Sequence, residues 1–411
     1  MITRGINPVW NIYPREYPAV AGVSTAVAKA VRDPIGSPLL ERLVRPGCTV
    51  AIAVDDLTRP TPQREVLPVV LDELNRLGVS KTQITLIIGL GVHRPMNEDE
   101  IRARFGESVV HRVAAIINHD PRDEFCTVVG RTGTGEPISV NTRFVKADLK
   151  IAVGCILPHV YAGWSGGAKM VQPGISSQRT TAHVHRMANI HLPTILGTVD
   201  NIVRQEMEQI ARAAGLQFIV NVVLNSRNEV AAVVAGDPVA AHRAGVRIAE
   251  QIYTWIDLEP ANIVVATAPA CATDLWQSAK SMAVGVRGMK QGGTLILVAP
   301  CPEGVSPGHH AITQLGAASF DDVLAMVDAG AVDDVVGALV HMTISRCRER
   351  GEIVLVSSGV SAREAHALGL GHADSVETAL EAALLRHGPK AKVGVIKDAG
   401  ELTISIKGGP N

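Results

Sequence analysis

Short aliphatic and β-branched runs alternate with longer amphipathic stretches along most of the chain. The first clear unit starts with the apolar run 48–54, passes through a polar turn, and continues into a helical pattern over residues 61–77. An apolar run at 83–90 and a charged helical stretch at 97–112 follow. This alternation is typical of parallel strands joined by helices. Further strands are expected near residues 113–118, 149–156 and 218–224, and a long helix is expected over residues 239–255.

A polar segment with a proline interrupts the alternation at residues 257–261, and an apolar run at 262–269 starts it again. We therefore predict two α/β domains with mainly parallel sheets, over residues 1–258 and 262–411, and an active-site cleft between them. Because chain ends often pack on earlier domains, the last 20–30 residues are open to either domain. In the second half strands are expected near 294–298, 353–356 and 392–396, and helices near 276–289, 320–329 and 375–387.

Composition narrows the class of protein. In the 411 residues, 39 Lys and Arg nearly cancel 40 Asp and Glu, so no basic field favours nucleic-acid binding. With 46% hydrophobic residues the chain can bury a large core, and with 3% aromatic residues that core must be aliphatic.

The sequence has no apolar segment long enough for a spanning helix and no apparent signal peptide. We expect a cytoplasmic protein without membrane contact, scattered free cysteines, and a homo-oligomer as an open possibility.

Polar residues cluster directly after the predicted strands, where open α/β sheets bind ligands. The turn 55–62 holds two acids and Arg59, which can grip a carboxylate or phosphate; a salt-bridged structural turn is the equal alternative. The segment 89–95 places His93 behind closely spaced glycines, at the position of a strand-end base. A lone histidine is more often structural.

The densest segment covers residues 154–174 and carries His159, Trp164, Ser165 and Lys169 in a glycine-rich loop. A mere connection does not need this mixture of proton carriers and donors. The segment is not a nucleotide P-loop, because alanine and methionine flank the lysine. Beyond it, His183 and His185 form only a weak metal motif, since they lack cysteine or carboxylate partners at ligand spacing.

The second half of the chain also places polar residues after a predicted strand. Gln277 and Lys280, three residues apart, would share one face of a helix start, and a plain solvated helix start is the equal alternative. Since both halves deliver polar residues from strand ends, a ligand cleft between the two domains is favoured.

Taken together, these residues resemble the lactate racemase family, whose members use a nickel-pincer nucleotide. The most specific part is residues 157–169, in which His159 precedes Lys169 by ten positions, and His185 follows sixteen positions later. The resemblance implies a pyridinium-3-thioamide-5-thiocarboxylic acid mononucleotide tethered to Lys169, nickel bound by His185, and cofactor-assembly proteins as partners. It implies a racemase or epimerase that inverts the second carbon of a 2-hydroxy acid by reversible hydride transfer.

The remaining roles also follow from the resemblance. His93 and His159 would be the two bases, one for the hydroxyl of each enantiomer, and Arg59 with Lys280 would hold the substrate carboxylate. The substrate site would further include Tyr161, Trp276 and Gln277, and the cofactor site Asp56, Trp164 and Ser165.

The sequence departs from the lactate enzymes at Trp276, where a tyrosine is expected, so lactate, malate, aryl and sugar acids all stay open as substrates. Two other functions were weighed. One is a nucleotide- or phosphate-binding α/β protein without racemase activity, and the weaker one is a zinc hydrolase, for which a clear third ligand is missing.

Overall fold

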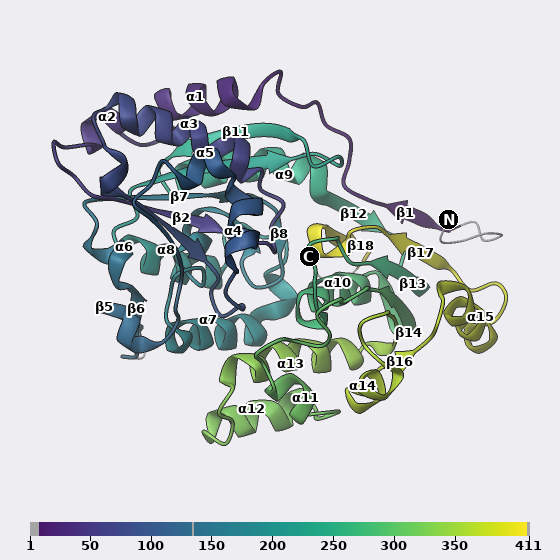
Figure 1. The fold of residues 1–411 in the computed structure, drawn as a ribbon. Helices are drawn as coiled ribbons and strands as arrows, with labels where there is room; N and C mark the ends of the chain where they lie inside the picture. Colours follow the sequence, from purple (N-terminus) through teal and green to yellow (C-terminus); the bar gives the residue numbers. More distant parts are fainter. Residues whose placement is uncertain (1–7, 134, 409–411) are drawn as a thin grey trace.

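The computed structural model describes residues 8–133 and 135–408, which form two six-stranded sheets (Figure 1). The first sheet has the order β11-β10-β7-β2-β3-β4, and only β10 and β11 pair antiparallel. All residues of the central strand β2 are buried, as expected of a parallel strand covered on both faces. The strands are β2 (Val50–Asp55), β3 (Ile84–Gly89), β4 (Ala115–Asn118), β7 (Leu149–Cys155), β10 (Phe218–Leu224) and β11 (Val230–Gly236).

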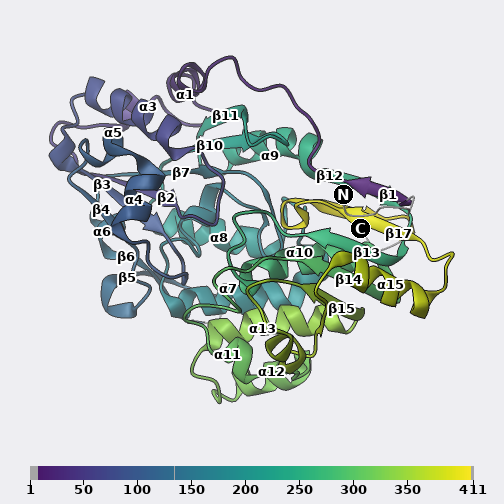
Figure 2. The same ribbon diagram turned by 45° about the vertical axis from the view of Figure 1, so that its right-hand side comes forward.

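Helices cover both faces of this sheet. Figures 1 and 2 show α1 and α3 on one face and α6 and α8 on the other, with a small hairpin of β5 and β6 beside them. Helix α9 lies on the face of α8, to which the ion pair between Arg243 and Glu208 joins it. The helices are α1 (Val23–Arg32), α2 (Leu40–Leu43), α3 (Gln63–Arg76), α4 (Glu98–Phe105), α5 (Glu107–Val110), α6 (Thr142–Lys146), α7 (Gln178–His191), α8 (Ile202–Ala213) and α9 (Ala240–Tyr253); the hairpin strands are β5 (Cys126–Arg131) and β6 (Pro137–Asn141).

The second sheet has the order β1-β17-β13-β14-β15-β16, and all its pairs are parallel. Helices α10 and α13 are buried along most of their length and lie between this sheet and α7 of the first unit. The strands are β1 (Trp10–Ile12), β13 (Ala261–Thr267), β14 (Met289–Val298), β15 (Gly351–Val356), β16 (Gly371–His372) and β17 (Val393–Ile396). The helices are α10 (Leu275–Arg287), α11 (Ala311–Gln314), α12 (Phe320–Asp328), α13 (Val335–Arg348), α14 (Ala362–Ala367) and α15 (Val376–His387).

The predicted fold class, two α/β units with mainly parallel sheets, is confirmed, although some predicted elements differ. The helix expected over 97–112 is broken at Gly106, which has a φ of +77° and separates α4 from α5. The helix expected over 239–255 ends at Tyr253, because the chain turns there into β12. Within the described residues 8–133 and 135–408, no helix is both long and apolar enough to cross a membrane.

The two ends of the chain meet in the second unit. Strand β1, from the N-terminal end, pairs with β17, while β12 (Thr254–Leu258) pairs with β18 (Thr403–Ile406). The division at residues 258 and 262 remains a prediction, but the sheet that contains β13 also contains a strand from the other end of the chain.

The six cysteines are free, and Cys126 and Cys271 are only partly buried.

The packing of Trp10 provides a test of this arrangement. A Cβ atom added to Gly394 in β17 would overlap the Trp10 indole ring, so Gly394→Ala must displace the ring from the sheet. Overpacking of this kind costs about 1–3 kcal/mol. We expect a lower midpoint of urea unfolding for Gly394→Ala, measured by circular dichroism. Gly130→Ala, in strand β5 with an open surrounding, is the control, and equal midpoints for the two variants would contradict the packing described.

Candidate active site

A cavity of about 950 Å³, its mouth included, lies between the two units at the carboxyl ends of β2, β3 and β7. Its walls come from the turns after those strands and from helices α7, α10 and α13. Ten of the twelve predicted site residues line it: Asp56, Arg59, His93, His159, Tyr161, Ser165, Lys169, His185, Trp276 and Lys280. Gln277 lines two adjoining hollows instead, and Trp164 is not part of the wall.

The glycine-rich loop after β7 is held by its own polar side chains. Ser165 Oγ donates to the Cys155 carbonyl at 2.8 Å and accepts from the Leu157 N–H at 2.8 Å. The Trp164 indole is fully buried and donates to the Gly197 carbonyl at 3.1 Å. In the described structure, Trp164 and Ser165 therefore shape the loop, and their predicted contact with a cofactor remains a prediction.

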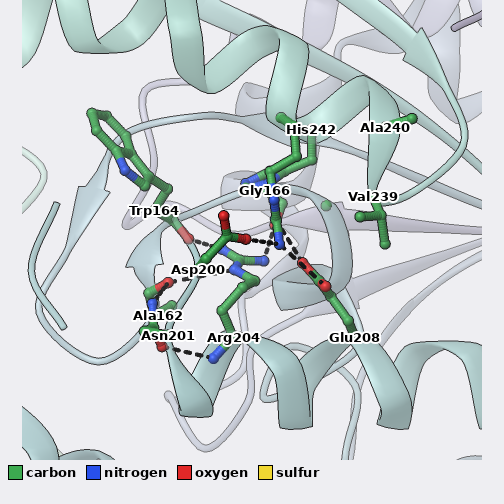
Figure 3. Close-up of polar contacts among 12 residues, drawn as sticks. Ala162, Trp164, Gly166, Asp200, Asn201, Arg204, Glu208, Val239, Ala240 and His242 are labelled. Carbon is green, nitrogen blue, oxygen red and sulfur yellow. Dashed lines mark hydrogen bonds and ion pairs between the residues drawn. The ribbon is translucent and has the colours of Figure 1, made fainter. Parts of the chain in front are cut away.

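A buried arginine on α8, Arg204, also binds this loop. Its guanidinium donates to the carbonyls of Ala162 at 3.4 Å and Gly166 at 3.2 Å, and also to that of Trp164 (Figure 3). Its burial lowers the pKa to about 10, so the group stays charged near neutrality. Because Arg204 donates to three carbonyls of the loop that leads to Lys169, it fixes the position of this loop and of the lysine that follows it.

A chain of hydrogen bonds joins the two units through His93. Its Nδ1 lies 2.7 Å from Asp56 Oδ2, and its Nε2 lies 2.9 Å from the Gln277 amide nitrogen. A carboxylate only accepts, so the neutral ring carries its proton on Nδ1 and accepts from Gln277 at Nε2. The Gln277 oxygen in turn accepts from Lys280. Burial alone would raise the pKa of Asp56, but His93 and the two Thr58 hydrogen bonds hold it well below its usual range.

His159 lies in a different electrostatic environment. Its Nδ1 accepts the Tyr161 N–H at 3.2 Å, and burial together with the charges of Lys169, Lys280 and Arg59 holds its pKa well below the usual value. The ring is therefore neutral near pH 7.

The Tyr161 hydroxyl does not point freely into the cavity. It hydrogen-bonds to Thr343 Oγ1 on α13, and the Asn189 amide lies 3.5 Å from it. Burial raises the pKa of Tyr161 to about 12, so the phenol keeps its proton. The predicted contact between Tyr161 and a substrate substituent remains a prediction, and in the described structure this phenol joins the two units.

Three cationic side chains share the cavity. Burial, followed by the charges of Arg59 and Lys280, holds the pKa of Lys169 well below its usual value, and burial with Arg59 lowers the pKa of Lys280 to about 7. The Arg59 guanidinium donates to the Thr58 carbonyl at 2.7 Å, and no carboxylate of residues 8–133 or 135–408 forms an ion pair with it. An anionic ligand would relieve this concentration of positive charge.

His185 has the character of a metal ligand. It is buried on α7, its Nδ1 has no hydrogen-bond partner among the described residues, and burial followed by the charge of Lys169 lowers its pKa to about 3. A neutral imidazole keeps the lone pair that a metal requires. In the described part of the chain no three His, Cys, Asp or Glu side chains form a metal cluster, so a metal here would draw its other ligands from a bound group.

Sequence reasoning pointed to the segments of His309, Arg94 and Glu303 but not to their contacts, which line a hollow beside the main cavity. His309 stacks edge-on against Trp276 with ring centres 4.1 Å apart, and it bridges Asp334 at 2.9 Å and the Val92 carbonyl at 3.0 Å. Another contact between the units, Arg94 to Glu303, measures 2.7 Å. The sequence offered no signal for these pairs, because their partners lie far apart in the chain.

The fold and the cavity together define an α/β protein with a cavity lined by cationic side chains between two mainly parallel sheets. Two family models match the chain, the lactate racemase N-terminal domain over residues 6–194 and the lactate racemase C-terminal domain over residues 256–404. The chain therefore belongs to the lactate racemase family, as the resemblance implied, and this membership indicates an isomerase of the racemase type.

Two relatives of similar sequence are lactate racemases. The chain is 33% identical to the lactate racemase of Thermoanaerobacterium thermosaccharolyticum over 68% of its own length, and it spans 66% of that protein, just under two thirds. It is 30% identical to the lactate racemase of Lactiplantibacillus plantarum over 90% of its own length and 88% of the relative.

Solved structures show the same fold. The lactate racemase apoprotein of T. thermosaccharolyticum superposes with a TM-score of 0.85 at 27% identity, covering 96% of this chain and 94% of that one. A Thermotoga maritima protein at 20% identity superposes with a TM-score of 0.76 over 94% and 97% of the two chains, which supports the fold alone.

Arg204 can be tested by removing its guanidinium. Arg204→Met leaves the loop carbonyls without their buried donor, and a buried acceptor left without its donor costs about 1–3 kcal/mol. We expect a lower unfolding midpoint and faster proteolysis within the loop. Arg212→Met, on an exposed position of the same helix, should change stability by no more than about 0.5 kcal/mol. Equal behaviour of the two variants would show that Arg204 does not hold the loop.

The lowered pKa of Lys280 predicts unusual reactivity. An amine with a pKa of about 7 is half neutral at that pH, whereas an ordinary lysine, at about 10.4, is almost fully charged. With trace acetic anhydride, labelling of Lys280 should rise between pH 6 and 8 and then level off, while labelling of surface lysines continues to rise to pH 10. Peptide mass spectrometry measures both. A Lys280 profile parallel to the surface lysines would contradict the expected pKa.

Proposed function

We propose that this protein is a 2-hydroxy acid racemase or epimerase that depends on a nickel-pincer nucleotide. The observation that carries the proposal is the convergence on one cavity of Lys169, His185, His93 and two cations, Arg59 and Lys280. This set matches the demands of the reaction: a tether, a metal ligand, a base and a grip for a carboxylate. Lactate is one candidate substrate among several.

The side chains fit the proposed cofactor. Lys169 faces the cavity with its amine held towards the neutral form, which a covalent bond to an acyl or thioacyl group requires, and His185 offers an unprotonated imidazole to nickel. When bound, the cofactor supplies a reversible hydride acceptor, so that a carbon with a barely acidic C–H bond can be inverted. Proteins that assemble and deliver this cofactor are the partners that the proposal requires.

The chain's own residues then bind the substrate and move the hydroxyl proton. Arg59 and Lys280 hold the carboxylate, although Lys280 contributes full charge only below its pKa of about 7. His93 accepts the hydroxyl proton at Nε2, because Asp56 fixes the proton of the neutral ring on Nδ1 and stabilises the imidazolium that forms. The Gln277 amide now occupies that nitrogen and must yield to the substrate.

His159 is proposed as the base for the other enantiomer. Its Nδ1 is engaged by the Tyr161 N–H, so the neutral ring carries its proton on Nε2. To accept a hydroxyl proton at Nε2, His159 must take up the tautomer that carries its proton on Nδ1, and the Tyr161 N–H contact must then be released.

The covalent tether gives the sharpest test. Protein matured with the cofactor-assembly enzymes should gain the cofactor mass on Lys169, and Lys169→Ala should lose both this adduct and racemisation of a panel of enantiopure 2-hydroxy acids. Intact-mass analysis and chiral chromatography measure the two effects. Lys29→Ala, an exposed lysine on α1, should keep both. A Lys169→Ala protein that still racemises an acid would refute the tether.

The two bases have their own test. His93→Ala and His159→Ala should each slow racemisation by roughly 10²–10⁴-fold, the usual contribution of general acid–base catalysis. The rates are measured from each enantiomer in turn by chiral chromatography. Unchanged rates in both directions would rule the assignment out.

The concentration of positive charge also favours a second candidate, a nucleotide- or phosphate-binding protein without racemase activity. Calorimetric titration of the purified chain with ATP, NAD and inorganic phosphate separates the two. Micromolar affinity for ATP or NAD, with no racemisation after maturation, would favour this candidate.

A further inference from the structure

A side chamber adjoins the main cavity and shares part of its wall. Arg59, His159 and Lys280 line both spaces, so the chamber begins where the proposed grip on the substrate carboxylate ends. Its far wall is formed by Cys271, from the turn after β13, and by Glu401, from the short helix Ala399–Glu401 that follows β17. Glu401 thus also stands at the carboxyl end of a parallel strand, like the site residues of the first unit.

The Glu401 carboxyl group lacks a strong partner. The Cys271 thiol lies beside it, with Sγ 4.0 Å from Oε1, and among the described residues Glu401 forms no ion pair with Arg59 or Lys280. Burial and Asp398 raise the pKa of Glu401 to about 7, while Arg59 and Lys280 oppose the rise. Glu401 is partly buried and lines the same chamber as Arg59 and Lys280, so a ligand in that chamber would meet the acid and the two cations together.

We propose that Glu401 forms the subsite for the substituent on the second carbon of the substrate, and that it selects hydroxyl-bearing substituents against a second carboxylate. The inference rests on the proposed function, because it takes Arg59 and Lys280 as the grip on the first carboxylate. A substrate held there extends its substituent into the chamber, towards Glu401.

The selection follows from the chemistry of a carboxyl group. A substrate hydroxyl donates to the ionised form and accepts from the protonated form, so it pairs with Glu401 in either state. A second carboxylate meets the ionised form as a like charge in a water-poor space, which disfavours dicarboxylates. A methyl substituent gains neither contact. The favoured substrate class is therefore a hydroxylated monocarboxylic acid, such as a 2,3-dihydroxy acid or a sugar acid.

Two variants test the subsite. Glu401→Gln keeps the shape and the hydrogen bonding but removes the charge, and Glu401→Ala removes the group. In matured enzyme, we expect kcat/KM for malate relative to 2,3-dihydroxypropanoate to rise about tenfold in Glu401→Gln, the effect of removing about 1.4 kcal/mol of repulsion. Glu401→Ala should lower kcat/KM for the dihydroxy acid about tenfold, through loss of one charged hydrogen bond. Glu381→Gln, an exposed glutamate on α15, is the control and should change neither value.

The same two acids are titrated calorimetrically into the cofactor-free variants, so that the subsite is tested separately from turnover, and thermal melts confirm folding. An unchanged ratio of malate to dihydroxy acid in Glu401→Gln, in both turnover and binding, would overturn the subsite. If matured wild-type protein racemises no 2-hydroxy acid, the proposed function fails, and the binding ratio alone then decides whether Glu401 discriminates between the two acids.

Discussion

The structure depends on the burial of positive charge around one cavity. Arg59, Lys169 and Lys280 face the same space, while Arg204 lies just behind it. Burial first, and the charges of the neighbours second, lower the pKa values of Lys169, His159 and His185, and they lower that of Lys280 to about 7, where this amine is half charged. Neutral amines and imidazoles are what covalent tethering, metal binding and proton uptake need. The same positive charge would stabilise an anionic ligand in the cavity.

The cavity is complete only where the two sheets meet. The first unit supplies the loop with His159 and Lys169, and the second supplies Gln277 and Lys280 from the start of α10. Hydrogen bonds between the units also orient these side chains. Because the Gln277 amide reaches the Nε2 atom of His93, the orientation of this imidazole depends on the contact between the two units.

In the proposed function, we expect substrate choice to depend on walls beside the proposed catalytic residues. Trp276 packs between His93 and His309 and closes one side of the main cavity, whereas Glu401 closes the side chamber. Tyr161 is tied to Thr343 and cannot easily serve both units and a substrate.

The sequence alone determined the α/β class, the approximate strands and the family, because aliphatic runs and strand-end motifs such as 157–169 are local in the chain. It also placed ten of its twelve site residues in the wall of one cavity, since parallel strands bring their carboxyl ends to one edge. Only the tertiary structure decided that β1 joins the second sheet, that Arg204 holds the loop, and that Glu401 stands beside Arg59. Those contacts join residues remote in the chain, where burial and charge, rather than local pattern, set the outcome.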